Sequence, residues 1–143
     1  MAIWFKEMTL EDLNRFGKNT MSEFLGIQFI QIGDDFLKAT MPVNARTRQP
    51  IGILHGGANV ALSETVASTA ANAVIDVNQF FCVGLEINAN HIRSVKEGMV
   101  TAITSPLHLG RSTQVWEVKI FNEEGKLTCI SRMTASVINR PNE

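Results

Sequence analysis

Apolar and polar residues alternate along six segments of the chain, which is the pattern expected of strands that bury one face. The segments are residues 27–32, 36–41, 81–92, 99–109, 113–121 and 127–138. Gly33-Asp34-Asp35 separates the first two segments, and Asn122-Glu123-Glu124-Gly125 separates the last two. Both are turn sequences, so each of these pairs is predicted to form a hairpin.

Two short helices are predicted ahead of the first strand. Thr9-Leu10-Glu11-Asp12 has the form of a capping box, so a helix is expected from there to about Phe16. A second helix is expected over residues 20–25, where Gly26 stops it.

A long helix is predicted over residues 57–75, after a polar loop at 42–52. It is rich in alanine, and small side chains allow a helix to approach a sheet closely. Helices and strands are grouped rather than strictly alternating along the chain. This order predicts an α+β fold in which an antiparallel sheet wraps around one long helix.

Composition indicates a single globular domain over residues 1–143, with 45% hydrophobic and 19% charged residues. A net charge of -1 argues against non-specific nucleic-acid binding. We expect no signal peptide and no membrane partner, because no run approaches the roughly 20 apolar residues of a membrane span. Cys82 and Cys129 fit no metal or redox spacing, which favours a cytoplasmic location.

The stretch from His55 to Ser68 carries the most informative chemistry. His55-Gly56-Gly57 leads into the long helix, whose first N–H groups and positive dipole end suit a developing oxyanion. Glu64 is a lone carboxylate in a nearly uncharged run, and Ser68 shares its face one turn later. The alternatives are a plain tight turn, a solvated glutamate and a serine that bonds back to the main chain.

Spacing along the helix predicts a dimer. Gly56 and Glu64 are eight residues apart, about 12 Å along a helix axis. The oxyanion donor and the carboxylate of one chain therefore cannot easily reach the same carbonyl carbon. Two chains with antiparallel helices would bring the helix start of one to Glu64 of the other, which predicts a homodimer with two composite sites.

Together with these features, several motifs closely resemble the hotdog-fold acyl-CoA thioesterases, in the branch that acts on aromatic acyl-CoAs. The motifs are residues 52–57, Glu64 with Ser68, residues 83–88, His91 with Arg93, and residues 106–111. Within this family, the chain is most similar to bacterial enzymes that hydrolyse 1,4-dihydroxy-2-naphthoyl-CoA in menaquinone synthesis. It is also similar to the proofreading enzymes that clear misloaded aryl carrier protein in enterobactin synthesis. The resemblance implies a tetramer built as a dimer of dimers.

The resemblance also implies roles for individual residues. Glu64 would be the catalytic carboxylate, either as nucleophile or as general base, and Ser68 would position it or the water. The Gly56 N–H would polarise the thioester carbonyl, with help from Gln49 and His55. The coenzyme A channel would be lined by Gly84, His91, Ile92, Arg93, Ser94, His108, Leu109, Gly110, Arg111, Ser112 and Thr113.

Two of these channel residues are placed by the strand pattern as well. His91 and Arg93 are two apart, so they are expected on one face of a single strand. The three histidines are widely spaced in sequence, so we expect no metal and no cofactor.

The expected activity is hydrolysis of aromatic acyl-CoA thioesters to a free acid and CoA. One alternative is proofreading of acylated carrier protein. Another is a hotdog hydratase or dehydratase in which His55 is the base, and a third is a non-catalytic acyl-CoA binding module. The sequence leaves open the acyl group, the choice between CoA and carrier-protein thioesters, and the nucleophile or base role of Glu64.

Overall fold

The computed structural model describes residues 1–141 as three helices and one six-stranded sheet. The helices are α1 (Leu10–Phe16), α2 (Met21–Phe24) and α3 (Gly56–Ala73). The strands are β1 (Gln28–Ile32), β2 (Leu37–Pro42), β3 (Phe80–His91), β4 (Met99–Leu109), β5 (Thr113–Phe121) and β6 (Leu127–Asn139). All neighbouring strands are antiparallel, in the order β1-β2-β4-β5-β6-β3.

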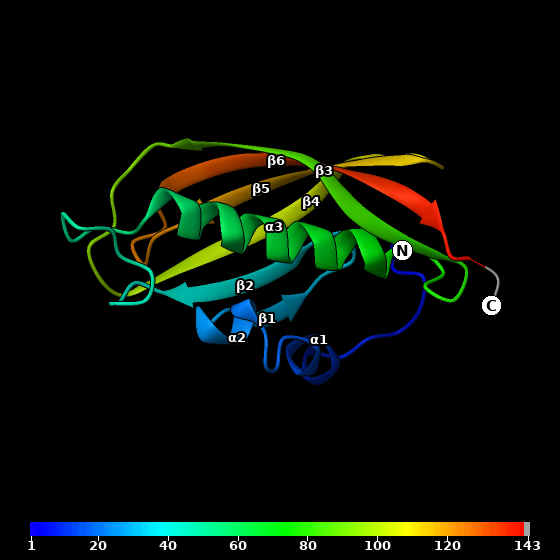
Figure 1. Cartoon of the computed structure of the whole chain (residues 1–143), viewed down its shortest axis with the longest axis horizontal. Helices are drawn as coiled ribbons and strands as arrows, with labels where there is room; N and C mark the ends of the chain where they lie inside the picture. Colours follow the sequence, from blue (N-terminus) through cyan, green and yellow to red (C-terminus); the bar gives the residue numbers. More distant parts are fainter. Residues whose placement is uncertain (142–143) are drawn as a thin grey trace.

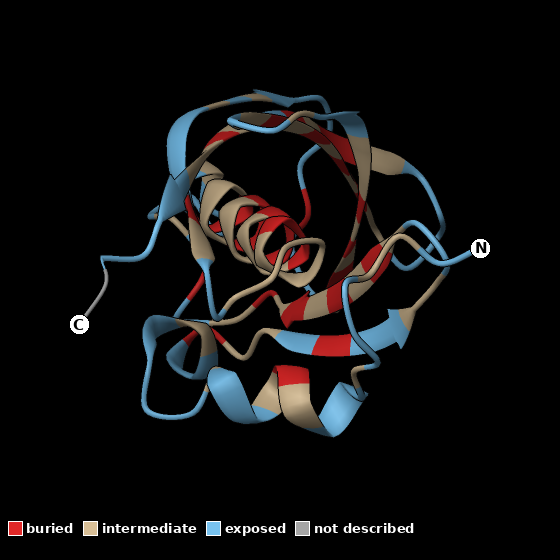
Figure 2. Cartoon of the chain, turned by 90° about the vertical axis from the view of Figure 1, so that its right-hand side faces the viewer, coloured by how far each residue is buried: buried red, intermediate tan, exposed pale blue. Residues whose placement is uncertain are grey.

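The sheet curves around α3, as Figures 1 and 2 show from two directions. Buried and partly exposed residues alternate strictly along β2 and β5, so one face of the sheet is turned to the helix. Ala67, Ala70 and Ala71 of α3 are fully buried, and α3 packs against β2, β3, β4, β5 and β6. The predicted α+β hotdog arrangement is confirmed, and its cause is a helix of small side chains packed inside an amphipathic sheet.

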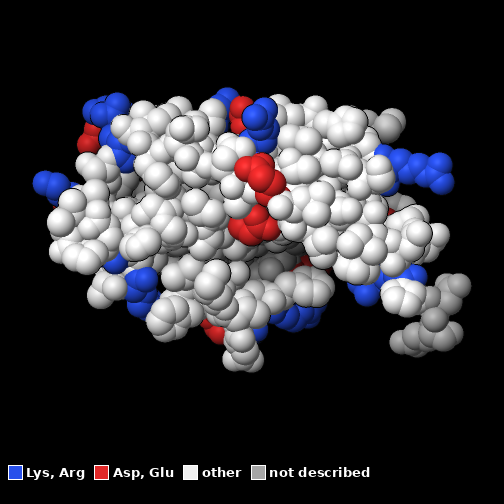
Figure 3. All heavy atoms as spheres, turned by 45° about the horizontal axis from the view of Figure 1, so that its top comes forward, with Lys and Arg blue, Asp and Glu red and all other residues white. Residues whose placement is uncertain are grey.

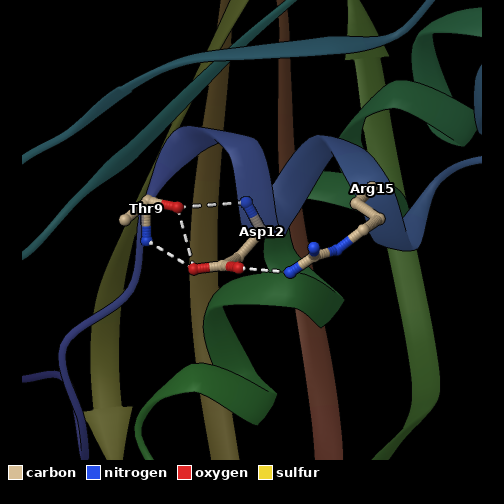
Figure 4. Close-up of polar contacts among 3 residues, drawn as sticks. All are labelled: Thr9, Asp12 and Arg15. Atoms are coloured by element: carbon tan, nitrogen blue, oxygen red, sulfur yellow. Dashed lines mark hydrogen bonds and ion pairs between the residues drawn. The ribbon is translucent and has the colours of Figure 1, made fainter.

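Helix α1 begins at a capping box. The Thr9 hydroxyl accepts a hydrogen bond from the Asp12 N–H, and the Asp12 carboxylate accepts one from the Thr9 N–H (Figure 4). The hydrogen bonds from Thr9 lower the pKa of Asp12, which also pairs with Arg15 at 2.6 Å. Helix α2 likewise begins after a capping residue, Thr20, whose hydroxyl accepts a hydrogen bond from the Ser22 N–H. These local signals set the helix starts where the sequence predicted them.

The predicted element boundaries agree with the structure to within two residues, but Arg93 lies outside β3. We expected a strand over residues 81–92 with His91 and Arg93 on one face, whereas β3 ends at His91. The backbone N–H groups of Ile92 and Arg93 both donate to the Thr128 carbonyl, so the regular ladder stops there. Arg93 lies in the following loop, and the prediction that it shares a strand face with His91 is wrong.

Strand β3 forms one edge of the sheet and is twelve residues long. Val83, Leu85 and Glu86 are exposed, and the register with β6 shifts between Gly84 and Glu86. A long edge strand with exposed apolar side chains is a surface suited to pairing with another strand. No helix within residues 1–141 has the length and apolar character needed to cross a membrane.

Two buried hydrogen bonds through Gln114 connect the sheet to α3. The Trp116 Nε1–H donates to Gln114 Oε1, and Gln114 Nε2 donates to the Ala71 carbonyl of α3. We expect Gln114→Leu to lower the free energy of unfolding by about 1–3 kcal/mol, because it leaves the buried Trp116 N–H without a partner. Urea denaturation measures this, with the exposed Gln28→Leu as control. Equal stability of the two variants would contradict the prediction.

Candidate active site

The start of α3 presents free hydrogen-bond donors. His55 is the N-cap, and its Nδ1 accepts a hydrogen bond from the Gly57 N–H at 2.8 Å. An accepting Nδ1 places the proton of the neutral ring on Nε2, which is left as a donor. The Gly56 N–H finds no acceptor within residues 1–141, whereas the next two amides after Gly57 donate to the His55 carbonyl. A carbonyl oxygen at this point would meet the Gly56 N–H and the positive helix end.

The loop before α3 is held rigidly to the rest of the fold. The His55 N–H donates to the Thr47 carbonyl at 2.8 Å, and the buried Thr47 hydroxyl donates to the Pro42 carbonyl. Gln49 closes a tight turn, in which its Oε1 accepts from the Ile51 N–H at 2.8 Å. The Oε1 atom of Gln49 is therefore already hydrogen-bonded. The Nε2 amide group of Gln49 is the donor that remains available to a substrate carbonyl.

Glu64 and Ser68 interact on the partly exposed side of α3. The Ser68 hydroxyl donates to Glu64 Oε1 at 2.9 Å, so the predicted one-turn pairing exists. The Glu64 carboxylate lies against Gly84 of β3, where an added Cβ would stand 2.5 Å from Oε1. The carboxylate is thus held between a serine and a bare glycine backbone, next to the free edge of the sheet.

His91 packs onto the start of α3. A Cβ added to Gly56 would lie 3.0 Å from His91 Nε2, and the Asn59 side-chain nitrogen lies 3.2 Å from His91 Nδ1. The Leu54 N–H donates to the Val95 carbonyl, so the exposed residues 92–94 run beside the same loop. The structure therefore brings the predicted channel residues 91–94 to the oxyanion end of the helix.

Residues 108–113 form the β4–β5 turn at the opposite end of α3. The Gly110 N–H donates to the Thr113 carbonyl, and Arg111 and Ser112 line a groove of about 640 Å³ with residues 74–76. The 18-residue helix α3 separates this turn from Gly56 by about 27 Å. One chain therefore presents the predicted site residues as three separate groups, at the start, the middle and the end of α3.

A further groove, of about 490 Å³, opens beside Ser68. Met8, Leu13 and Phe16 line it from the N-terminal segment and α1, with Thr69 on α3. The Thr69 hydroxyl donates to the Thr65 carbonyl within the helix, so its polar group is already paired. No sequence pattern predicts Met8, Leu13 or Thr69 as site residues, because only the packing of α1 beside α3 brings them together.

Figure 3 shows one small acidic patch next to a hollow near the middle of that face, in a surface that is mostly neither acidic nor basic. Burial raises the pKa of Cys82 to about 11 and also raises the pKa of Cys129. Neither thiol is a thiolate nucleophile near neutral pH.

Gly84 has no side chain at the point where the Glu64 carboxylate lies against β3. Gly84→Ala would place a methyl group 2.5 Å from Glu64 Oε1, so the carboxylate must move. We expect kcat to fall by about tenfold to a hundredfold, because small misplacements of a reacting group are costly. Thiol-release kinetics measures this, with a melting curve to establish folding. Unchanged kcat in folded Gly84→Ala would show that the observed carboxylate position is not the working one.

Comparisons with known proteins give a consistent result. A family model described as "Thioesterase superfamily" matches residues 51–129. The chain is 52% identical over 136 residues to the 1,4-dihydroxy-2-naphthoyl-CoA hydrolase of Escherichia coli, covering 95% of this chain and 99% of that one. It is 48% identical to the proofreading thioesterase EntH of Cronobacter turicensis, covering 95% and 98%. A crystal structure of a Q49A mutant of the Pseudomonas aeruginosa thioesterase PA1618 superposes with a TM-score of 0.96 at 44% identity, covering 97% and 100%.

Proposed function

The chain belongs to the thioesterase superfamily, and we propose that it hydrolyses aromatic and hydroxyaromatic acyl-CoA thioesters to the free acid and CoA. Because it belongs to this superfamily, the protein is a thioester hydrolase. The alternative functions of hydratase and of non-catalytic acyl-CoA binding module are therefore not favoured. The proposed substrate is 1,4-dihydroxy-2-naphthoyl-CoA in menaquinone biosynthesis, supported by 52% identity to an enzyme named for that reaction. Proofreading of aryl carrier protein is the second candidate, supported by 48% identity to EntH.

The observation that carries the proposed mechanism is the fixed Glu64 carboxylate on the helix whose start bears free donors. The Gly56 N–H and His55 Nε2–H would donate hydrogen bonds to the thioester oxygen. One such donor lowers the activation barrier by on the order of 3 kcal/mol. As a base, Glu64 would take a proton from water while the water oxygen bonds to the carbonyl carbon. As the C–S bond breaks, that proton would pass to the departing thiolate sulfur. As a nucleophile, Glu64 would instead bond to the carbonyl carbon while the C–S bond breaks and CoA leaves as the thiolate. Water would then hydrolyse the resulting anhydride to the free acid and the Glu64 carboxylate.

The proposed active unit is a homodimer of single domains spanning residues 1–143. Within one chain about 12 Å separates Gly56 from Glu64, too far for both to act on one carbonyl. The free edge of β3 lies beside Glu64 at Gly84 and beside Gly56 at His91. Antiparallel pairing of this edge with its copy would bring the helix start of one chain toward Glu64 of the other. By family resemblance, two such dimers would form the tetramer.

The dimer would also complete the coenzyme A channel. Arg93 lies near the start of α3 and Arg111 near its end, and both are exposed. With antiparallel helices, the end of one helix approaches the start of the other, so the two arginines would approach across the interface. Guanidinium groups bind phosphate through paired hydrogen bonds, and coenzyme A carries three phosphates.

The groove beside Ser68 is the proposed acyl site. Its volume of about 490 Å³ lies within the range of sites that hold compounds of drug size. Met8, Leu13 and Phe16 give it an apolar wall, which suits a flat aromatic ring. This wall supports an aromatic acyl group, and a ring bound in the groove would lie next to Ser68 and its partner Glu64.

Free-thiol release from a panel of thioesters tests the proposal. The panel holds benzoyl-CoA, a hydroxynaphthoyl-CoA, a medium-chain acyl-CoA and an aryl carrier protein thioester. We expect the highest kcat/KM with the hydroxynaphthoyl-CoA. Preference for the carrier-protein thioester would favour proofreading, and preference for the medium-chain substrate would overturn the aromatic assignment.

A further inference from the structure

We propose that Asn59 is a positioning residue that holds the His91 ring over the start of α3 with its proton on Nε2. This inference rests on the proposed function, since it assigns His91 a part in substrate binding. Asn59 is only 5% exposed, and its Nδ2 lies 3.2 Å from His91 Nδ1. His91 is exposed at the end of β3, so the contact joins a buried helix residue to a ring on the surface.

The ring that Asn59 holds lies directly against the helix backbone. His91 Nε2 and Cε1 would lie 3.0 and 3.3 Å from a Cβ added to Gly56. The absence of a side chain at Gly56 thus leaves room for the edge of the imidazole. The ring atom that faces Gly56 is Nε2, the nitrogen that Asn59 does not contact.

The hydrogen bonding of Asn59 selects the tautomer. An amide nitrogen only donates, so with Nδ2 toward the ring, His91 Nδ1 must accept and the proton of the neutral ring is on Nε2. Asn59 Oδ1 is then buried without a partner. The reversed amide would bury an NH₂ group with two unpaired donors instead. Buried unpaired donors are rarer than under-satisfied carbonyls, which favours the orientation with Nδ2 toward His91.

An unpaired buried amide oxygen destabilises the fold, so a structural role alone does not explain Asn59. Asn59 instead orients the Nε2–H donor of His91. His91 Nε2 lies against Gly56, whose own N–H has no acceptor within residues 1–141. The oriented Nε2–H would bind an oxygen of the coenzyme A portion of an acyl-CoA, in keeping with the predicted place of His91 in the coenzyme A channel.

The test combines kinetics with the imidazole nitrogen and carbon NMR signals of His91, assigned with His91→Ala. We expect wild type to show the Nε2–H tautomer and Asn59→Ala a mixture of both tautomers. Asn59→Asp, which can only accept at Nδ1, is expected to move the proton to Nδ1 or to protonate the ring fully. In Asn59→Ala, KM should rise about fivefold to tenfold with kcat within about twofold, the size of one lost hydrogen bond.

Two controls separate positioning from packing. Ser63→Ala removes a fully buried hydroxyl that bonds to Ser131 on the side of α3 facing the sheet, and it should change neither the tautomer nor KM. In a His91→Ala background, Asn59→Ala should not raise KM further. Asn59→Ser provides a second small variant if Asn59→Ala does not fold.

Two results would overturn the proposal: an unchanged tautomer in the folded Asn59 variants, or an equal rise in KM with and without His91. If wild type hydrolyses no thioester, the proposed function fails, but the NMR signals still decide whether Asn59 positions the ring.

Discussion

Replacing Glu64 with Ala is expected to lower kcat for every accepted thioester by about a thousandfold or more. General-base assistance alone contributes about 10²–10⁴-fold to a rate, and loss of a nucleophile costs at least as much. The fold should survive, because Glu64 is only half-buried and the polar contact it makes within residues 1–141 is the hydrogen bond from Ser68. Thiol release and thermal melting measure the two effects separately.

Matched variants sharpen this experiment. Glu64→Gln keeps the shape of the side chain and should be nearly as inactive as Glu64→Ala, because the charge and basicity are lost. Ser68→Ala should lose only about tenfold, since the hydroxyl orients the carboxylate and does not react. Glu97→Ala removes an exposed carboxylate elsewhere and should leave kcat unchanged. Turnover of Glu64→Ala within a few-fold of wild type would remove Glu64 from the central role.

A single turnover in ¹⁸O-water distinguishes the two possible roles of Glu64. If Glu64 is a general base, the labelled oxygen enters the product acid directly. If Glu64 is a nucleophile and water attacks its side of the anhydride, the label stays on the enzyme carboxylate. Mass spectrometry of the peptide that contains Glu64 reads this difference.

Local signals explain why so much of the fold could be predicted. The capping box at Thr9 and the turn at residues 122–125 depend on residues within four positions of one another. The pairing of Glu64 with Ser68 follows in the same way from one turn of helix. Each of these features can be derived from the chain itself without knowing how distant segments pack.

Features made by distant segments could not be predicted in this way. The end of β3 at His91 depends on Thr128, and the contact between Asn59 and His91 joins residues 32 positions apart. The wall of the groove beside Ser68 depends on where α1 packs. The periodicity of the sequence does not predict these contacts, because they depend on the curvature of the sheet and on how distant segments pack around α3.

A mixture of two inactive chains is expected to recover activity if the sites are composite. One chain carries Glu64→Ala and the other His55→Ala. In a mixed dimer, one site would combine the intact His55 of the first chain with the intact Glu64 of the second, and the other site would carry both defects. After random exchange about half of the dimers are mixed, each with one working site, so activity should return to about a quarter of wild type.

The same experiment decides whether Gly56 and Glu64 of one chain act on the same thioester. If Gly56 and Glu64 of one chain acted on one thioester, every site in the mixed dimer would keep one defect, and activity would stay near that of the parent variants. A mixture of Glu64→Ala with Glu64→Gln is the control, because no combination of these chains restores a carboxylate. Native mass spectrometry must show mixed dimers in both cases. Mixed dimers without recovered activity would place the complete site within a single chain, and α3 would then have to bend or the thioester bind along it to span about 12 Å.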